Sequence, residues 1–97
     1  GGISINRINR MDMIGNVGYW VRESLQNQGI ASAALELIKT FGFQSLGLTR
    51  LEIVILEENH ISRRLAEKSG AKFECLARNR LLHNEQPTDA LVYSLIP

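Results

Sequence analysis

The sequence predicts an α/β or α+β fold organised around one sheet, and it argues against a helical bundle or a β-sandwich. Apolar residues repeat with a period of two in the first segment of the chain, and with helical spacing in two later segments that are separated by a short apolar run. The expected order is therefore strand, strand, helix, strand, helix, strand, strand. A chain of 97 residues has room for one hydrophobic core and no second domain.

The first two strands are expected to pair as a hairpin. Ile3 and Ile5 share one face of the first segment, as in a half-buried strand. A turn that ends at Gly15-Asn16 follows, and segment 17–21 after it is rich in β-branched and aromatic residues.

An amphipathic helix is expected from about residue 30 to residue 42. Its apolar side chains recur at spacings of three and four, which places them on one face. This stripe consists of Ile30, Ala34, Leu37, Ile38 and Phe41. The next apolar run, from Arg50 to Glu57, is short and almost continuous, so it is expected to be a central strand that is buried on both faces.

A second helix is expected from about His60 to Ser69. Asn59 precedes it as an N-cap, and Gly70 follows it at the position where a left-handed residue commonly ends a helix. Two further strands are expected at 71–76 and 90–96. The stretch between them is rich in turn-forming residues, so a loop is expected at His83-Asn84-Glu85-Gln86-Pro87-Thr88-Asp89.

Composition and charge exclude several classes of protein. Hydrophobic residues make up 44% of the chain and charged residues 22%, which is typical of a globular domain and not of a disordered tail. The net charge of +1 gives little attraction for nucleic acid. No apolar run in the sequence approaches the length of about 18 residues that a membrane-spanning helix needs. The single cysteine, Cys75, has no partner for an internal disulfide, so a reducing, cytoplasmic location is expected.

The loop before the first helix has the features of an anion-binding site. Gly29 and Ala31 are small enough to let a ligand approach the backbone closely. The first N–H groups of a helix lack internal partners and lie at the positive end of its dipole, which suits a diphosphate. The residues alone leave a second interpretation open, in which Gly29 only permits a tight turn. The sequence contains neither a G-x-G-x-x-G dinucleotide pattern nor a P-loop lysine here.

Several short motifs follow one another along the chain. They are Gly18-Tyr19-Trp20-Val21, Q-x-x-G-x-A at 26–31, N-x-x-S at 59–62 with Lys68-Ser69-Gly70-Ala71 after it, and Leu91-Val92-Tyr93-Ser94-Leu95. In this order they resemble the Gcn5-related N-acetyltransferase (GNAT) superfamily, and more closely its RimJ/RimL branch of ribosomal-protein acetyltransferases. The resemblance runs from Gly2 to Ile96.

This resemblance implies a mixed, mostly antiparallel sheet with helices on its faces, which forms the C-terminal portion of the acyl-CoA N-acyltransferase fold. It implies acetyl-CoA as a co-substrate. The residues that it implies for the acetyl-CoA site are Trp20, Val21, Gln26, Asn27, Gln28, Gly29, Ile30, Ala31, Ser32, Asn59 and Ser62.

Each implied residue has a role in the transfer of an acetyl group. Trp20 and Val21 would end a strand that splays from its neighbour and hydrogen-bonds the thioester carbonyl. Segment 26–32 would hold the pyrophosphate, and Asn59 would contact the pantetheine arm. Ser62 would be the general acid that protonates the departing thiolate.

The residues themselves also allow structural roles. In this second interpretation, Asn59 would only cap the helix and Ser62 would only be a serine in its first turn. The side chains of Tyr19 and Trp20 are expected in the core. Relatives often carry a glutamate at the position of Asn16, and some carry a general-base glutamate near the positions of Arg80, Leu81 and Leu82. Glu85 and Asp89 are carboxylates nearby, and the sequence leaves the general base unassigned.

The chain is expected to be a single, partial N-acetyltransferase domain over residues 1–97, because relatives carry further elements before this segment. It would acetylate a primary amine, foremost a protein N-terminal α-amine; the alternative is a catalytically silent acetyl-CoA-binding or assembly module. An unpaired sheet edge would favour a homodimer or larger assembly. No membrane, direct nucleic-acid or metal partner is expected, since His60 and His83 have no partners at ligand spacing.

Overall fold

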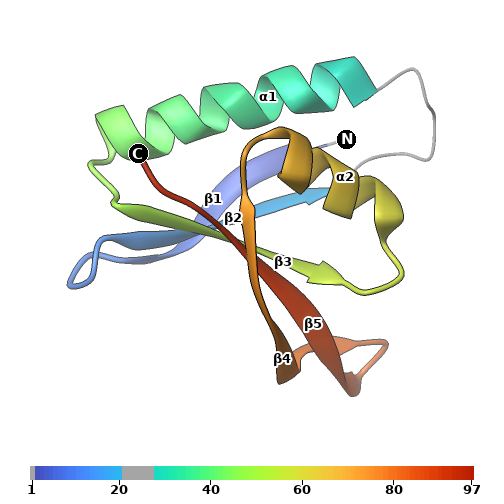
Figure 1. The fold of residues 1–97 in the computed structure, drawn as a ribbon. Helices are drawn as coiled ribbons and strands as arrows, with labels where there is room; N and C mark the ends of the chain where they lie inside the picture. The colour runs from blue at the N-terminus through green and yellow to red at the C-terminus, as the bar shows by residue number, and fades with distance from the viewer. Residues whose placement is uncertain (1, 21–27) are drawn as a thin grey trace.

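The computed structural model describes residues 2–20 and 28–97, and it shows a five-stranded sheet covered by two helices (Figure 1). The predicted order of strands and helices is confirmed. The elements are β1 (Gly2–Asn9), β2 (Ile14–Trp20), α1 (Gln28–Thr40), a π-helical turn η2 (Phe41–Ser45), β3 (Arg50–Leu56), α2 (His60–Lys68), β4 (Lys72–His83) and β5 (Gln86–Leu95).

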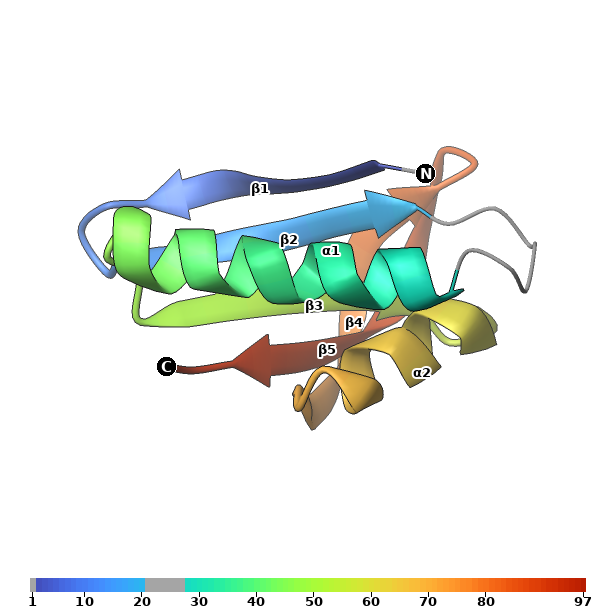
Figure 2. The same cartoon turned by 90° about the horizontal axis from the view of Figure 1, so that it is seen from above.

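The sheet has the order β1-β2-β3-β5-β4, with β2 and β3 parallel and the other neighbours antiparallel. This confirms a mixed, mostly antiparallel sheet. Helices were expected on its faces, yet both described helices lie on the same face (Figures 1 and 2). The reason is that β2–α1–β3 and β3–α2–β4 are successive crossovers in one direction along the sheet, and right-handed connections then place both helices on one side.

The hydrophobic core lies between this face and the two helices. Leu35 of α1 and Leu65 and Ala66 of α2 pack against alternate side chains of the strands. β3 is central, as predicted, but only Leu51, Ile53 and Ile55 are fully buried. The expectation that β3 is buried on both faces is therefore wrong, because no described helix covers the other face of the sheet.

The predicted stripe of α1 is also partly wrong. Ile30, Leu37 and Phe41 are 71%, 73% and 49% exposed, whereas Leu35 is fully buried. In a helix with about 3.6 residues per turn, Ile30 and Leu37 lie about 140–160° around the axis from Leu35. Phe41 belongs to the π-helical turn η2 that follows α1. On the other side of Leu35, Lys39 donates from Nζ to the backbone oxygen of Ser69 at 2.7 Å, so that side faces α2. The exposed apolar side chains therefore point away from the core and from α2.

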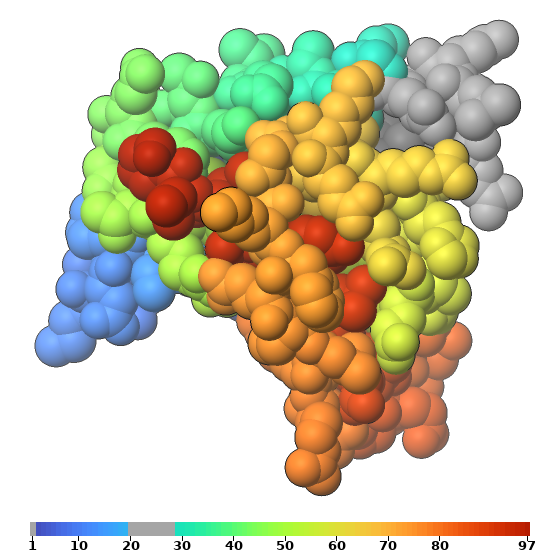
Figure 3. Space-filling view, viewed as in Figure 1, coloured from blue at the N-terminus to red at the C-terminus, as the bar shows by residue number. Residues whose placement is uncertain are grey.

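The last two strands are longer than predicted. Their connection consists of Asn84 and Glu85, which have φ of 51° and 63°. Two successive residues with positive φ form the type I′ turn that matches the twist of a tight hairpin. The loop predicted over residues 83–89 is therefore wrong. β5 pairs with β3 only from Ala90 to Leu95. The part of the β4–β5 hairpin nearest the turn therefore extends beyond the rest of the sheet as an arm (Figure 3).

A salt bridge ties β3 to β4 on the face that lacks described helices. Arg50 donates from both terminal nitrogens to Glu74, at 2.7 and 2.6 Å, and from Nε to Glu52 at 3.0 Å. Hydrogen bonding to Arg50 lowers the pKa of Glu74 to about 2. The carboxylate is thus ionised, and the bridge intact, throughout the neutral range.

Gly15 lies inside β2 and not in the turn where the sequence placed it. A Cβ atom added there would lie 2.9 Å from Ile5 Cγ2 and 2.9 Å from Leu48 Cδ1. Both neighbours belong to the packed interior between the sheet and α1. The absence of a side chain therefore lets β2 reach its position beside β3.

We expect Gly15→Ala to destabilise the fold by about 1–3 kcal/mol, since overpacking forces buried neighbours to move. Gly29→Ala is the matched control, because an added Cβ at Gly29 meets no described atom within 4 Å. Urea unfolding followed by circular dichroism measures both. Equal stability of the two variants would contradict the close packing at Gly15.

Candidate functional site

β2 and β3 are paired over a short stretch and then diverge. Their parallel register comprises Ile14–Arg50, Gly15–Leu51 and Asn16–Glu52. β1 remains paired with β2 as far as the Gly2–Trp20 pair. From residue 17 to residue 20, the other edge of β2 therefore has no described strand partner. The predicted splay of this strand from its neighbour is confirmed, and it leaves backbone polar groups available for another partner.

Both helices begin at the end of the sheet where β2 diverges from β3. In Figure 2, α1 and α2 have their N-termini on the side toward which the arrow of β2 points. In open α/β sheets, this end, beyond the carboxyl ends of parallel strands, is where ligands bind. The helix N-termini add outward N–H groups and the positive ends of two dipoles.

The first turn of α1 is open to solvent. Gly29 and Ile30 are exposed, and Ala31 and Ser32 are half-buried. A side chain at Gly29 would meet no described atom within 4 Å, and the first turn contains no acidic residue. A ligand can therefore reach the backbone at this helix start without repulsion from a carboxylate.

Asn59 and Ser62 form the N-terminal turn of α2. Asn59 Oδ1 accepts from the backbone N–H of Ser62 at 3.2 Å, which confirms the predicted N-cap. Ser62 is 6% exposed. Asn59 therefore has the structural role that the sequence left open for it. Asn59 is nevertheless exposed at the site.

Tyr19 connects β2 to this turn. Its hydroxyl donates to the backbone oxygen of Ser62 at 2.8 Å. Burial raises the pKa of Tyr19 to about 12. The sequence indicated only a core aromatic here, because nothing in the spacing of Tyr19 and Ser62 along the chain reveals a contact across 43 positions.

The structure brings some of the predicted site residues together. Trp20 ends β2 and Gln28 begins α1, while Asn59 and Ser62 lie across the splay from β2. Gly29, Ile30, Ala31 and Ser32 form the start of α1. Val21, Gln26 and Asn27 lie outside the described residues.

The two carboxylates that follow the candidate general-base region in the sequence, Glu85 and Asp89, lie in the β4–β5 hairpin. Glu85 is exposed in the hairpin turn, and Asp89 Oδ1 accepts from the backbone N–H of Asn79 at 2.9 Å. Asn16 donates from Nδ2 to Asn6 Oδ1 at 3.0 Å, and its own Oδ1 is buried without a partner among the described residues. It stands where β2 and β3 make their last pair.

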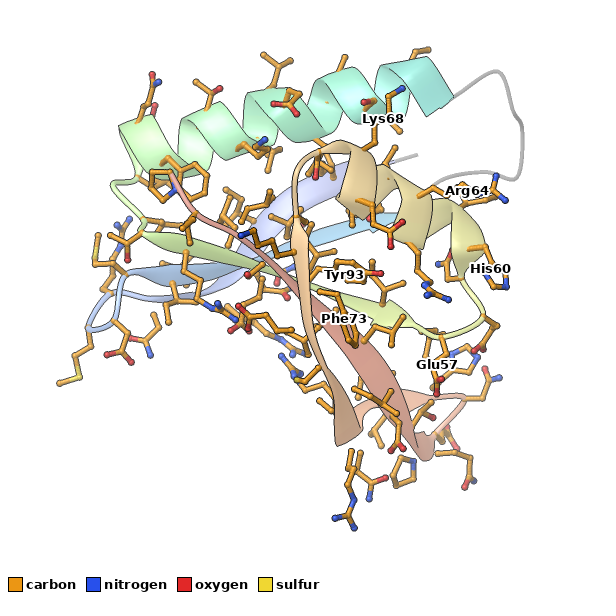
Figure 4. The ribbon with its side chains drawn as sticks, viewed as in Figure 1. Glu57, His60, Arg64, Lys68, Phe73 and Tyr93 are labelled. Carbon is orange, nitrogen blue, oxygen red and sulfur yellow. The ribbon has the colours of Figure 1, made fainter. Side chains whose placement is uncertain are left out.

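Metal ligands are not clustered in the part of the chain that the structure describes. His60 is exposed on α2 (Figure 4), and the described residues contain no group of three or more His, Cys, Asp or Glu side chains placed to hold a metal ion. None of the described helices combines the length and the apolar character needed to cross a membrane.

Known proteins resemble this chain along almost its whole length. The family model described as "Acetyltransferase (GNAT) domain" matches residues 1–72. The ribosomal-protein-serine acetyltransferase of Escherichia coli K12 is 36% identical over 97 residues, which are 99% of this chain and 54% of that protein.

Two solved structures have the same fold and contain coenzyme A. Mycobacterium smegmatis RimJ, in complex with CoA-disulfide, superposes with a TM-score of 0.87 at 27% identity and covers 97% of this chain and 46% of its own. RimL, described as a ribosomal L7/L12 alpha-N-protein acetyltransferase in complex with coenzyme A, has a TM-score of 0.83 at 26% identity, with coverages of 97% and 53%.

The chain spans about half the length of the curated relatives that it matches. The match with the family model nevertheless includes β2, α1, β3 and α2, which are the elements that surround the splay. The order of the sequence motifs, the diverging parallel strands and these comparisons agree with one another. The chain belongs to the GNAT acetyltransferase family and is similar to its RimJ and RimL members.

Proposed function

We propose that this chain binds acetyl-CoA and transfers the acetyl group to a primary amine, with protein N-terminal α-amines as the acceptor class. The divergence of β2 from β3 beside two helix N-termini is the observation that carries this proposal. The similarity to RimL, an alpha-N-protein acetyltransferase of ribosomal L7/L12, supports the acceptor class. The exposed thiol of Cys75 fits a reducing cytoplasm, where we place the protein.

Each part of the site would bind one part of acetyl-CoA. The start of α1, with Gln26 to Ser32 as the proposed contacts, would hold the pyrophosphate through backbone N–H groups. The free edge of β2 as far as Trp20, with Val21 as a further proposed contact, would bind the pantetheine and polarise the thioester carbonyl. Asn59, exposed at the start of α2, would contact the pantetheine arm from the opposite side.

The proposed reaction needs no covalent enzyme intermediate. The neutral amine attacks the thioester carbon, so that a C–N bond forms and the C–S bond breaks. Ser62 gives its hydroxyl proton to the departing thiolate, and the proton that the amine loses returns to Ser62 through water. Backbone donors on β2 stabilise the negative charge that develops on the carbonyl oxygen.

The site predicts that Gly29→Asp abolishes acetyl-CoA binding, because the carboxylate would occupy the proposed pyrophosphate position and repel it. Gly29→Ala should keep most of the affinity, since its methyl group meets no described atom. Isothermal titration calorimetry with acetyl-CoA measures both, and circular dichroism verifies the fold. Unchanged affinity of Gly29→Asp would place the pyrophosphate elsewhere.

Ser62→Ala should lower kcat by about 100-fold or more, as for the loss of a general acid, with little change in acetyl-CoA affinity. Ser69→Ala is the matched control: both serines are 6% exposed, but Ser69 lies beyond the other end of α2, where its hydroxyl donates to the backbone oxygen of Ala66. Thiol release with a peptide amine as acceptor measures the rates. Binding without turnover in the wild-type chain would instead favour a catalytically silent module.

We also propose that the chain self-associates through the open edge of β1 and the neighbouring flank of α1. Ile30 and Leu37 of α1 and Phe41 of η2 are exposed, and the only charged residue of β1 is Arg7. Edge strands that lack several charges can pair with a second copy, and exposed apolar patches mark contact surfaces.

Leu37→Glu should therefore convert a dimer or larger assembly into a monomer. Lys68→Glu is an exposed change on α2, which lies at the opposite side of the sheet from β1 (Figure 2), and it should leave the assembly intact. Light scattering after size-exclusion chromatography gives the masses. A wild-type chain that is monomeric at micromolar concentration would refute self-association.

A further inference from the structure

The position of Ser62 depends on a contact that crosses the splay. Tyr19 lies on the part of β2 that has diverged from β3, and its hydroxyl reaches the backbone oxygen of Ser62 at 2.8 Å. The backbone N–H of Ser62 is held from the other side by Asn59 Oδ1 at 3.2 Å. With both backbone polar groups of Ser62 engaged, the main freedom left to its hydroxyl is rotation about χ1.

The hydroxyl of Tyr19 remains a hydrogen-bond donor to the Ser62 backbone oxygen across the neutral and mildly basic pH range. Burial holds its pKa near 12, so the phenol remains protonated over the pH range in which amines are acetylated. The backbone of Tyr19 is also held in place, because β2 is paired with β1 at the Ile3–Tyr19 position. One rigid aromatic ring therefore sets the separation between β2 and the first turn of α2.

A second tyrosine holds α2 further along. Tyr93 of β5 donates from its hydroxyl to Glu67 Oε2 at 3.0 Å, and Phe73 packs edge-on against its ring with centroids 5.6 Å apart (Figure 4). Tyr93 is 1% exposed and belongs to the core. Tyr93 and the buried Leu65 and Ala66 hold the rest of α2 on the sheet. Loss of the Tyr19 hydrogen bond would therefore affect only the turn that carries Ser62.

From this arrangement we propose that Tyr19 is a positioning residue for Ser62: its hydroxyl fixes the distance between the proposed general acid and the carbonyl-binding edge of β2. This inference rests on the proposed function, because Ser62 matters to catalysis only if the chain transfers an acyl group. A general acid must lie within hydrogen-bond reach of its target, and a displacement of about 1 Å can cost about 100-fold in rate. The ring of Tyr19 supplies this constraint without contacting the reacting atoms.

The test compares Tyr19→Phe with Tyr93→Phe, since each variant removes one hydroxyl that is hydrogen-bonded to α2. Tyr19→Phe should lower kcat about tenfold with the KM for acetyl-CoA nearly unchanged, because the acid is misplaced while the binding groups remain. Tyr93→Phe should lower Tm about as much as Tyr19→Phe does, because each variant loses one hydrogen bond to α2. Its kcat should nevertheless stay within about twofold of the wild type. Both are assayed for thiol release at a temperature where their circular dichroism matches that of the wild type.

A double-mutant cycle shows whether Tyr19 acts through Ser62. In the Ser62→Ala background, Tyr19→Phe should change kcat by less than about twofold, since the group that it positions is gone. Independent effects in the cycle would overturn the inference. So would equal losses of kcat in Tyr19→Phe and Tyr93→Phe, or a Tyr19→Phe chain that fails to fold.

The outcomes also separate this inference from the proposed function. If Ser62→Ala slows thiol release and Tyr19→Phe does not, only the positioning role fails. If Ser62→Ala has no effect on thiol release, the acid role of Ser62 fails and the positioning role fails with it, while acetyl transfer by the chain stands. If the wild-type chain releases no thiol from acetyl-CoA, the proposed function itself fails.

Discussion

β2 and β3 share a register of three residue pairs, and the candidate site exists because their pairing stops there. Each strand remains hydrogen-bonded on its other side, β2 to β1 and β3 to β5. The divergence therefore gives up only the bonds between β2 and β3. Backbone groups without a strand partner need another partner, and a pantetheine arm with its two amides and a thioester offers suitable ones. Gly15, packed against Ile5 and Leu48, lets the two strands come together before they part.

The two helices are held on the sheet in different ways. α1 has 13 residues and buries the sheet-facing side chain of Leu35 completely. α2 has nine residues, and directional hydrogen bonds from Tyr19 and Tyr93 supplement the burial of Leu65 and Ala66. Apolar packing is not directional, whereas a hydrogen bond fixes distance and angle. The helix that carries the proposed acid is thus tied to the sheet by directional contacts as well as by apolar packing.

Local patterns in the sequence predicted what depends on local chemistry. The order of the elements, the cap at Asn59 and the left-handed Gly70, with φ of 91°, follow from periodicity and from residue preferences at helix ends. The face of α1 was not predictable in the same way. Both of its apolar faces have helical spacing, and the sheet selects the one with Leu35.

Tertiary contacts decided the remaining differences. Gln86 to Asp89 look like a loop by composition, but pairing with β4 across a turn of two residues extends them into β5. At the candidate site, the family resemblance pointed to the segments that the structure places around the splay. The contact between Tyr19 and Ser62 had no signal in the sequence, because a hydroxyl bound to a distant backbone oxygen leaves no trace in spacing.

The core and the candidate site share their supports. On β2, Val17 and Tyr19 point to the same face, where Val17 is 2% exposed in the core and Tyr19 reaches α2. The strand alternation that buries one side chain therefore also aims the other at Ser62. On β3, Ile53 and Ile55 are buried in the core, and the strand ends just before the turn that begins α2. Both sides of the splay are consequently fixed by one set of buried residues.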